Sequence, residues 1–547
     1  MTWFDWFIVL SLNATIIGYG LYLARGTETS SQWFLGARAL PWWAVGLSMC
    51  ATNVDNADLV GVTGATYTSG LHIITVYALG SAVGGILAAY FVTPAIYRAG
   101  VYTNAEYLEA RFGPATRALS ALIQIQYRSS MLGMMIWSAH LLLTRLVGLS
   151  DVLAWIMIVG LVILAGLYTA WGGLRSVVWT DTAQGIVMMV AAIVIFCAVW
   201  QAVDGWTGMT RALQESGRED LLHIGRYRGD DERTSPWVVV LAWTIVGCGY
   251  WTVNHTQTMR LMGSRSIWDM KMAAIWGVAI SFPIMVVSAT LGVFARAIPE
   301  LSNLDSDQVD TIYPALASQF LIPGLKGIVV AGVLAAVVST FDSMGSALSA
   351  IFTRDIYARF LVRDRDDRHY LKVGRIATVG VLALGFLYLP FIWNQEYIIK
   401  AFTTLIPVFV TPLFTVYMLG VLTRVHRRSG IVGLLVGSAY GVLALVDREL
   451  YDLASLPSWL TSRWPAFCWS LLITTITMVV TTLVLGRDTR DTTTWSEDKG
   501  WLHRSREELP KLKEHPFAGE VPTYLQPRWA AVVLMIAAAY ATFVLFW

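Results

Sequence analysis

Residues 48–70 read SMCATNVDNADLVGVTGATYTSG, an apolar stretch of membrane-spanning length that asparagine, aspartate and threonine interrupt. Polar groups in hydrocarbon cost several kcal/mol unless protein, an ion or water satisfies them. Glycine-rich membrane helices are often close-packing surfaces, but such a surface does not need the carboxylates of Asp55 and Asp58. The stretch therefore predicts a helix that is broken in mid-membrane and lines a cavity.

The stretch at residues 246–260, VGCGYWTVNHTQTMR, is interrupted in the same way. Uninterrupted apolar runs lie between the two stretches. Secondary transporters are commonly built from inverted repeats that each begin with a discontinuous helix. The order of the runs therefore predicts two inverted repeats, at residues 42–203 and 236–424. Residues 1–41 are expected to form a peripheral first helix, and residues 425–547 peripheral C-terminal helices.

The whole chain has the composition of a membrane protein. Of its 547 residues, 56% are hydrophobic and 14% are charged, and the mean hydropathy is +0.57, which excludes an ordinary water-soluble fold. The apolar runs are long and uniform, so we expect helices rather than the alternating strands of a barrel. The sequence predicts a single all-α, polytopic transmembrane domain over residues 1–547. About 14 spans are expected, at residues 3–24, 42–70, 72–97, 117–147, 151–171, 177–203, 236–259, 270–296, 325–353, 374–394, 397–422, 430–446, 466–486 and 528–547.

The charged residues predict the orientation and the partners of the chain. Asp5 stands where a signal peptide would carry positive charge, so the first span is expected to be retained, with the N-terminus outside. This orientation places the basic residues between 354 and 375 in the cytoplasm, as the positive-inside rule requires. The net charge of +2 does not indicate a nucleic-acid partner. We expect a cell-membrane location, the lipid bilayer and a small-molecule solute as partners, and no obligate protein partner.

The sequence does not indicate chemistry on a substrate. No nucleophile, Walker or haem motif is present, so an enzyme is not expected. The cysteines fall inside or at the edges of apolar spans without metal-ligand spacing, which predicts small buried apolar side chains. They are Cys50, Cys197, Cys248 and Cys468.

A face of hydroxyl groups marks residues 331–360, which read AGVLAAVVSTFDSMGSALSAIFTRDIYARF. Positions i, i+3, i+4 and i+7 of a helix share one face, and here they are Ala336, Ser339, Thr340 and Ser343. Sodium is a hard ion that prefers oxygen ligands. Hydroxyl groups in membrane helices also often bond to the i−4 carbonyl, so this face alone leaves the sodium interpretation open.

With these stretches, the chain resembles the sodium/solute symporter family, which includes sodium/glucose cotransporters, the proline permease and sialic acid transporters. The resemblance covers about residues 33–424. It is carried by WFLGARALPWWAVGLS, ATNVDNADLVG, AGVYTNAEYLEARFG, YTAWGGLRSVVWTDTAQ, GYWTVNHTQTMR, LAAVVSTFDS and FTRDIYA, in the family's order. It implies a LeuT-type core of five plus five inverted helices, with broken first and sixth core helices.

The resemblance also implies where cations bind. One sodium ion, the coupling ion, would be held by the carbonyls of the broken first core helix and by a carbonyl and two hydroxyls of the eighth. The matching positions are Ala51, Val54, Ala336, Ser339 and Thr340. Some members have a second cation site, and its matching positions are Asp181, Asp342 and Ser343. Asp342 departs from the usual hydroxyl, so three roles stay open: cation binding, proton uptake, or pairing with an arginine such as Arg128.

The predicted solute site combines aromatic walls with a few convergent polar groups, which suits a small polar ligand. Its candidate residues are Asn53, Asp55, Asp58, Tyr77, Tyr250, Trp251, Asn254, His255 and Gln257. Where glucose cotransporters carry sugar-binding residues, this chain has Tyr77, Ser281 and Thr403, which does not favour glucose or galactose. A carboxylate at Asp58 would favour a cationic or hydrogen-bond-donating solute. Arg128 is expected to be structural or to act in gating.

The function expected is sodium-coupled import of a small polar solute by alternating access. The solute would be an amine, an amino acid, a polyol or a sugar-like molecule. Two alternatives remain open: a transporter-like nutrient sensor without net flux, and a proton-coupled symporter that uses Asp181 and Asp342.

Overall fold

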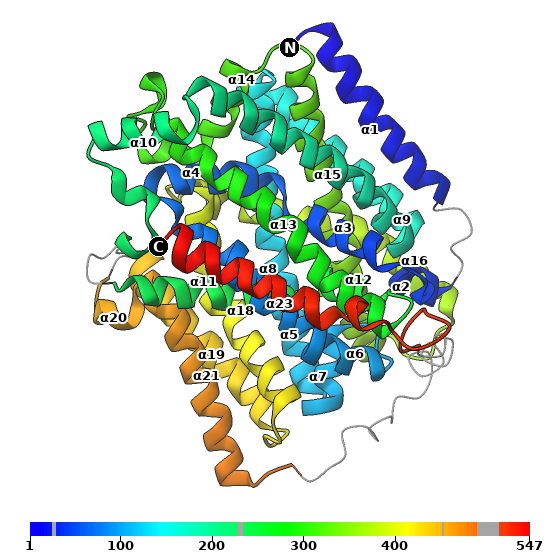
Figure 1. Cartoon of the computed structure of the whole chain (residues 1–547). Helices are drawn as coiled ribbons and strands as arrows, with labels where there is room; N and C mark the ends of the chain where they lie inside the picture. The colour runs from blue at the N-terminus through cyan, green and yellow to red at the C-terminus, as the bar shows by residue number, and fades with distance from the viewer. Residues whose placement is uncertain (24–28, 228–233, 451–452, 489–512) are drawn as a thin grey trace.

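The computed structural model describes residues 1–23, 29–227, 234–450, 453–488 and 513–547. These residues form a bundle of helices, and they contain no strand apart from a single bridge between Leu40 and Ser264. Figure 1 shows most of the helices packed side by side in one body. The prediction of an all-α membrane fold is confirmed.

Eleven helical segments in the described residues are long and apolar enough to cross a membrane. Helix α9 (Asp151–Ala202) contains two of the predicted spans, with Gly173 at φ 59° between them. The predicted spans at 42–70 and 117–147 are not among the eleven, so the count of fourteen stays a prediction. The segments are Trp3–Leu23, Leu71–Arg98, Asp151–Ala202, Pro236–Val253, Ile267–Ala295, Leu325–Leu361, Asp367–Trp393, Ile398–Leu422, Ser429–Arg448, Arg463–Leu485 and Pro527–Leu545.

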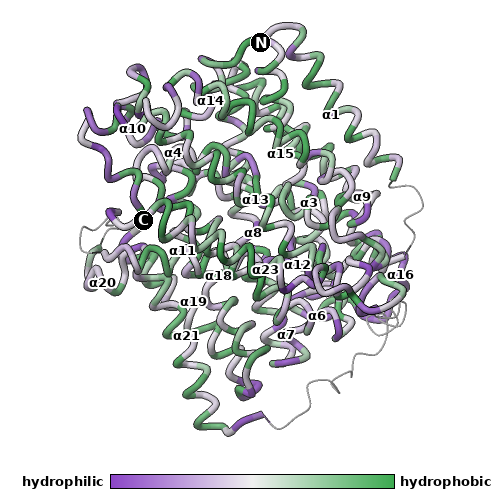
Figure 2. The backbone as a smooth tube through the Cα atoms, in the orientation of Figure 1, coloured by the Kyte–Doolittle hydropathy of each residue, from purple (hydrophilic) through white to green (hydrophobic). Residues whose placement is uncertain are grey.

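The hydropathy of the surface fits a bilayer. Hydrophilic residues gather towards the ends of the bundle, near α10 (Gly205–Glu215) and near α7 (Asn104–Phe112) (Figure 2). Large apolar side chains such as Phe7, Ile156 and Leu483 are exposed on the surface. Lipid tails are as apolar as such side chains, so their exposure costs little in a membrane.

The first core helix is broken, as predicted. Helix α3 (Trp42–Asn53) ends at Val54, and α4 (Asn56–Ser69) begins after Asp55. The Asp55 carboxylate accepts a hydrogen bond from the backbone N–H of Asp58 at 2.9 Å. This N-cap satisfies one of the free donors at the start of α4, so the polar residues of the stretch stabilise the break.

The sixth core helix is broken in the same manner. Helix α11 (Pro236–Val253) gives way to α12 (His255–Met262) at Asn254, whose ψ of 111° is extended. The Asn254 side chain accepts a hydrogen bond from the backbone N–H of Thr256 at 3.1 Å. The prediction of two interrupted helices is confirmed.

Helix α15 (Leu325–Ala350), which carries the hydroxyl face, is buried along almost its whole length. It packs against α9 and continues into a π-helical segment, η10 (Ile351–Leu361). Near its start, the Asp5 carboxylate of α1 (Trp3–Leu23) accepts hydrogen bonds from the backbone of Gly324 and Gly327, at 2.7 and 3.0 Å. The first helix therefore docks on the N-terminus of α15.

The cysteines differ from the prediction. Cys50 and Cys248 are buried, but Cys468 is half-buried and Cys197, on α9, is exposed. The prediction that all four are buried is wrong for Cys197 and for Cys468, because an apolar span can place a small apolar side chain against lipid as readily as against protein.

Two helical segments touch through their backbones at Gly80 and Gly247. Gly80 ends the π-helical segment η3 (Val76–Gly80), and Gly247 lies on α11. A Cβ atom on Gly80 would lie 2.6 Å from the Trp243 carbonyl oxygen. Glycine is required there because small residues allow such close approach of membrane helices.

The substitution Gly80→Ala is therefore expected to force η3 and α11 apart and to lower the unfolding temperature. Overpacking of this kind costs about 1–3 kcal/mol. The measurement is thermal unfolding of the purified protein in detergent. Gly380→Ala, on α16 (Asp367–Ala383), is the matched control, since nothing lies within 4 Å of its new methyl group. Equal unfolding temperatures for the two variants would contradict the backbone contact.

Candidate functional site

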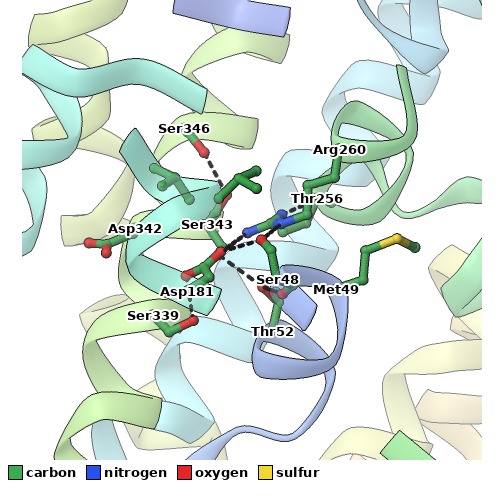
Figure 3. Close-up of polar contacts among 12 residues, drawn as sticks. Ser48, Met49, Thr52, Asp181, Thr256, Arg260, Ser339, Asp342, Ser343 and Ser346 are labelled. Carbon is green, nitrogen blue, oxygen red and sulfur yellow. Dashed lines mark hydrogen bonds and ion pairs between the residues drawn. The ribbon is translucent and has the colours of Figure 1, made fainter. Parts of the chain in front are cut away.

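A buried arginine lies where four of the helices meet. Nη2 of Arg260, on α12, lies 2.7 Å from Oδ2 of Asp181 on α9. Nε of Arg260 donates to the Ser48 hydroxyl of α3 at 2.7 Å, and Nη2 also donates to the Ser343 hydroxyl of α15. Figure 3 shows these side chains converging between the helices. We call Ser48, Asp181, Arg260, Ser339 and Ser343 the arginine cluster.

Both carboxylate oxygens of Asp181 are bound by donors of the chain. Ser339 donates to Oδ1 at 2.6 Å, and Ser48 donates to Oδ2 at 2.7 Å. A fully buried ion pair is tolerated only when good geometry and further hydrogen bonds offset its desolvation. The arginine cluster meets that condition, and it fastens α3, α9, α12 and α15 together.

The predicted sodium ligands lie next to this cluster. The carbonyl oxygens of Ala51 and Val54, at the broken end of α3, accept no hydrogen bond from the described residues. The adjacent Thr52 hydroxyl lies 3.1 Å from the Ser343 hydroxyl, so the broken end of α3 faces α15. Free carbonyls at the C-terminal end of a helix carry partial negative charge, and they therefore suit a cation.

The Ser339 and Thr340 hydroxyls of α15 also have oxygen lone pairs that suit a cation. Ser339 donates its proton to Asp181, and Thr340 donates its proton to the Ala336 carbonyl at 2.9 Å. A hydroxyl that donates its proton keeps lone pairs for another partner. These oxygens, with the free carbonyls of α3, fit a monovalent hard cation.

The predicted second cation set is only partly assembled. Asp181 and Ser343 lie together in the arginine cluster, but Asp342 points away from it (Figure 3). Thr169 donates to Oδ1 of Asp342 at 3.1 Å, and Oδ2 has no hydrogen-bond partner among the described residues. The suggested pairing of Asp342 with Arg128 is wrong, because Arg128 lines a cavity beside Asp55 and Asp58 instead.

Arg260 stands where the second cation was predicted. Another cation beside its guanidinium would meet a like charge in a region of low dielectric constant. The residues present therefore do not fit a second sodium ion. The sequence contained a signal for the Arg260–Asp181 ion pair. An arginine within an apolar span needs a carboxylate partner, and Asp181 is an acid within another predicted span.

A cavity of about 70 Å³ lies beside the two broken helices. Its lining includes residues of α3, α4, η3 and α11, and of two further helices, α8 (Pro114–Leu141) and α18 (Ile398–Leu422). Its polar lining consists of Asn53, Asp55, Asp58, Tyr77, Ser81, Tyr127, Arg128 and Tyr250. Its apolar lining includes Met131, Met134, Met135, Trp243, Val246, Ile398, Ile399 and Phe402.

The structure divides the predicted solute residues into two groups. Asn53, Asp55, Asp58, Tyr77 and Tyr250 line the cavity. Trp251, Asn254, His255 and Gln257 are buried outside its lining.

The second group has structural contacts. Gln257 Nε2 donates to the Tyr250 hydroxyl at 2.9 Å and to the Met49 carbonyl at 3.3 Å. His255 Nδ1 lies 3.4 Å from Oδ1 of Asn104. Gln257 therefore positions Tyr250, which itself donates to the Thr52 carbonyl at 3.1 Å.

A larger cavity, of about 440 Å³, opens next to the first, and Ile398 lines both. We call it the vestibule. Carboxylates of Asp151, Asp307, Asp310 and Glu396 are part of its lining. Its aromatic lining is Trp137, His140, Trp155, Trp393 and Tyr397.

A network of ion pairs lies at the C-terminal end of α15, where η10 follows it. Arg117, on α8, lies 2.6 Å from Glu109 of α7 and 2.8 Å from Asp355 of η10. Arg359 of η10 lies 2.5 Å from Glu109, and Arg354 lies 3.6 Å from Glu106. We call these residues the α7–η10 network. It closes that end of the bundle with largely buried charges.

The chain has relatives among known transporters. A model of the sodium:solute symporter family matches residues 33–437. The chain is 28% identical over 480 residues to a sodium/glucose cotransporter of Vibrio parahaemolyticus, which covers 80% of this chain and 86% of that protein. It is 27% identical over 479 residues to sodium/myo-inositol cotransporter 2 of Sus scrofa, which covers 80% of this chain and 69% of that protein.

Solved structures share the fold. A substrate-bound, outward-open sodium-coupled sialic acid symporter superposes with a TM-score of 0.75 at 21% identity, over 89% of this chain and 99% of that one. A transporter of the nucleobase-cation-symport-1 family, in a closed conformation, gives a TM-score of 0.55 at 11% identity, over 89% of this chain and 100% of that one.

Proposed function

Since the chain belongs to the sodium:solute symporter family, whose coupling ion is sodium, we propose that it imports a small polar solute across the cell membrane. The observation that carries the proposal is the set of oxygens between α3 and α15. The free carbonyls of Ala51 and Val54 lie at the broken end of α3, where the Thr52 hydroxyl is 3.1 Å from the Ser343 hydroxyl of α15. On α15, the Ser339 and Thr340 hydroxyls donate their protons to Asp181 and to the Ala336 carbonyl. The solute would bind in the adjacent cavity, against Asn53 and its neighbours.

The proposed cycle is alternating access between two inverted repeats, residues 42–203 and 236–424. Sodium would order the broken end of α3 against α15, and the solute would then bind beside it. With the N-terminus outside, the vestibule faces the exterior and the α7–η10 network faces the cytoplasm. A membrane potential of about 100 mV supplies about 2.3 kcal/mol per charge, which concentrates a neutral solute roughly fifty-fold.

Coupling of solute uptake to the sodium gradient is tested in proteoliposomes. The labelled solutes are alanine, proline, myo-inositol, glucose and putrescine. We expect an inward sodium gradient to drive accumulation of at least one of these solutes, and potassium to be ineffective. Because Arg260 fills the second position, the Hill coefficient for sodium is expected to be one. Accumulation driven by an inward proton gradient without sodium would instead favour the proton-coupled alternative. Sodium-dependent binding without accumulation would favour the sensor.

A further inference from the structure

Charged side chains of both signs line the solute cavity. They are Asp55, Asp58 and Arg128. No nitrogen of Arg128 lies within 4.0 Å of a carboxylate oxygen of the described residues. Charges in a largely apolar cavity are costly unless each one has a partner. The partners that the chain itself provides therefore decide what a solute must supply.

Asp55 has its partner within the chain. It is the N-cap of α4 and accepts a hydrogen bond from the backbone N–H of Asp58 at 2.9 Å. The N-terminus of a helix carries a partial positive charge that favours an anion at this position. The negative charge of Asp55 is therefore largely offset without a ligand.

Asp58 is the carboxylate left for a solute. It lies in the first turn of α4 and is partly exposed in the cavity. The Tyr77 hydroxyl donates to Oδ1 at 2.7 Å and holds the carboxylate in place. A carboxylate that balances a bound cation only accepts hydrogen bonds, so a protonated amine on the solute would supply both the donor and the balancing charge.

The unused donors of the cavity require an acceptor. Nε of Arg128 and Nδ2 of Asn53 have no hydrogen-bond partner among the described residues. Their side chains are only 3% and 6% exposed, so water does not replace that partner freely. A guanidinium binds a carboxylate better than any neutral acceptor, with the best geometry when two N–H groups bind together. The solute should therefore carry a carboxylate as well as an amine.

The size of the cavity limits the rest of the solute. Its volume of about 70 Å³ accommodates roughly five water molecules. The remaining walls are thioether, aliphatic and aromatic, with Met131, Met135 and Phe402 among them. They suit a short apolar side chain.

The vestibule favours the same class of solute. Its lining contains Asp151, Asp307, Asp310 and Glu396, of which Glu396 pairs with Lys400 at 3.4 Å, so the other three carboxylates give the vestibule its acidic character. An acidic mouth of this kind concentrates molecules that present a positive charge and repels simple anions. Aromatic rings such as Trp155 also attract ammonium groups. Because Ile398 lines both cavities, the vestibule lies next to the cavity that holds Asp58.

We propose that the solute is a small zwitterion, an amino acid whose ammonium group binds Asp58 and whose carboxylate binds Arg128 and Asn53. This proposal rests on the proposed function, since it identifies the solute that the sodium gradient would drive. It also explains why Asp58 and Arg128 face one cavity without pairing: the solute lies between them.

The test is a binding assay on the purified full chain in sodium, by thermal shift and calorimetry. The probes are small amino acids (alanine, serine and proline), isopropylamine, propionate, glycerol, myo-inositol and glucose. We expect one or more amino acids to bind, and the amine alone and the acid alone to bind at least tenfold more weakly. Tighter binding of myo-inositol, glucose or glycerol than of any amino acid would overturn the proposal.

Variants assign the two ends of the solute. Asp58→Asn should weaken amino-acid binding at least tenfold and reduce the preference for amino acid over propionate. Arg128→Gln should also weaken it tenfold and reduce the preference for amino acid over isopropylamine. Asp220→Asn and Arg211→Gln, at exposed positions, are the matched controls and should bind as the wild type does. Unchanged preferences in both cavity variants would overturn the assignment.

A sodium measurement separates this proposal from the proposed function. In the absence of solute, sodium should raise the unfolding temperature of Asp58→Asn and Arg128→Gln as it does that of the wild type, which also reports that both variants fold. Sodium stabilisation together with a neutral polyol as the tightest ligand would overturn the zwitterion and leave sodium coupling intact. Loss of sodium stabilisation in the wild type would contradict the sodium site itself.

Discussion

Replacing Ser339 with alanine and Thr340 with valine is expected to raise the sodium concentration for half-maximal uptake by about 100-fold. The double variant removes both hydroxyl oxygens that α15 offers to the ion. A polar contact to a charged group contributes about 1.5 kcal/mol, so two such losses amount to about 3 kcal/mol, or roughly 100-fold. The measurement is initial uptake by proteoliposomes against external sodium concentration.

The control for this experiment is Ser349→Ala on the same helix. Ser349 is buried and donates only to the Ser346 carbonyl at 2.9 Å, so its loss should leave the sodium requirement unchanged. The double variant must still insert and fold, which solute binding at saturating sodium reports. An unchanged sodium requirement in the double variant would mean that the ion binds elsewhere.

Arg260→Met is expected to destabilise the protein more than any other single change considered. It leaves the carboxylate of Asp181 fully buried without its cation. Removing one partner of a buried ion pair costs about 3–5 kcal/mol. We expect a large fall in unfolding temperature, measured by thermal shift in detergent, together with a loss of folded material.

The double variant Arg260→Met with Asp181→Asn should recover much of this loss, because it removes the unpaired charge. Comparison of both single variants with the double variant isolates the pair from their other contacts. The neutral pair still loses the hydrogen bonds that join α9 to α12, so full recovery is not expected. Equal stability of Arg260→Met and the wild type would show that the arginine cluster does not hold the helices together.

The fold was largely predictable from the sequence because its defining features are local. A cluster of asparagine and aspartate inside an apolar span has few structural solutions, and the break after Val54 is one of them. The break at Asn254 followed from the same reasoning. The exact number of spans did not follow, since α9 joins two predicted spans through the kink at Gly173.

The site was less predictable because it depends on which way each helix faces. Helical spacing correctly grouped Ser339 with Ser343. It did not reveal that the neighbouring residue Asp342 points towards Thr169. Likewise, Arg260 meets Asp181 only because α12 and α9 pack together, although the two residues are far apart in sequence. Helix packing likewise determines that Arg128 points into the cavity, which the sequence alone did not show.

The α7–η10 network has a consequence for how that end of the molecule opens. Its guanidinium and carboxylate groups are stable when they are paired and dry, and again when they are apart and hydrated. The arrangement between these two, separated but not yet reached by water, is the one with the highest free energy. The passage at that end should therefore be either shut or flooded, and a narrow, half-dry opening that leaks sodium should be scarcely populated.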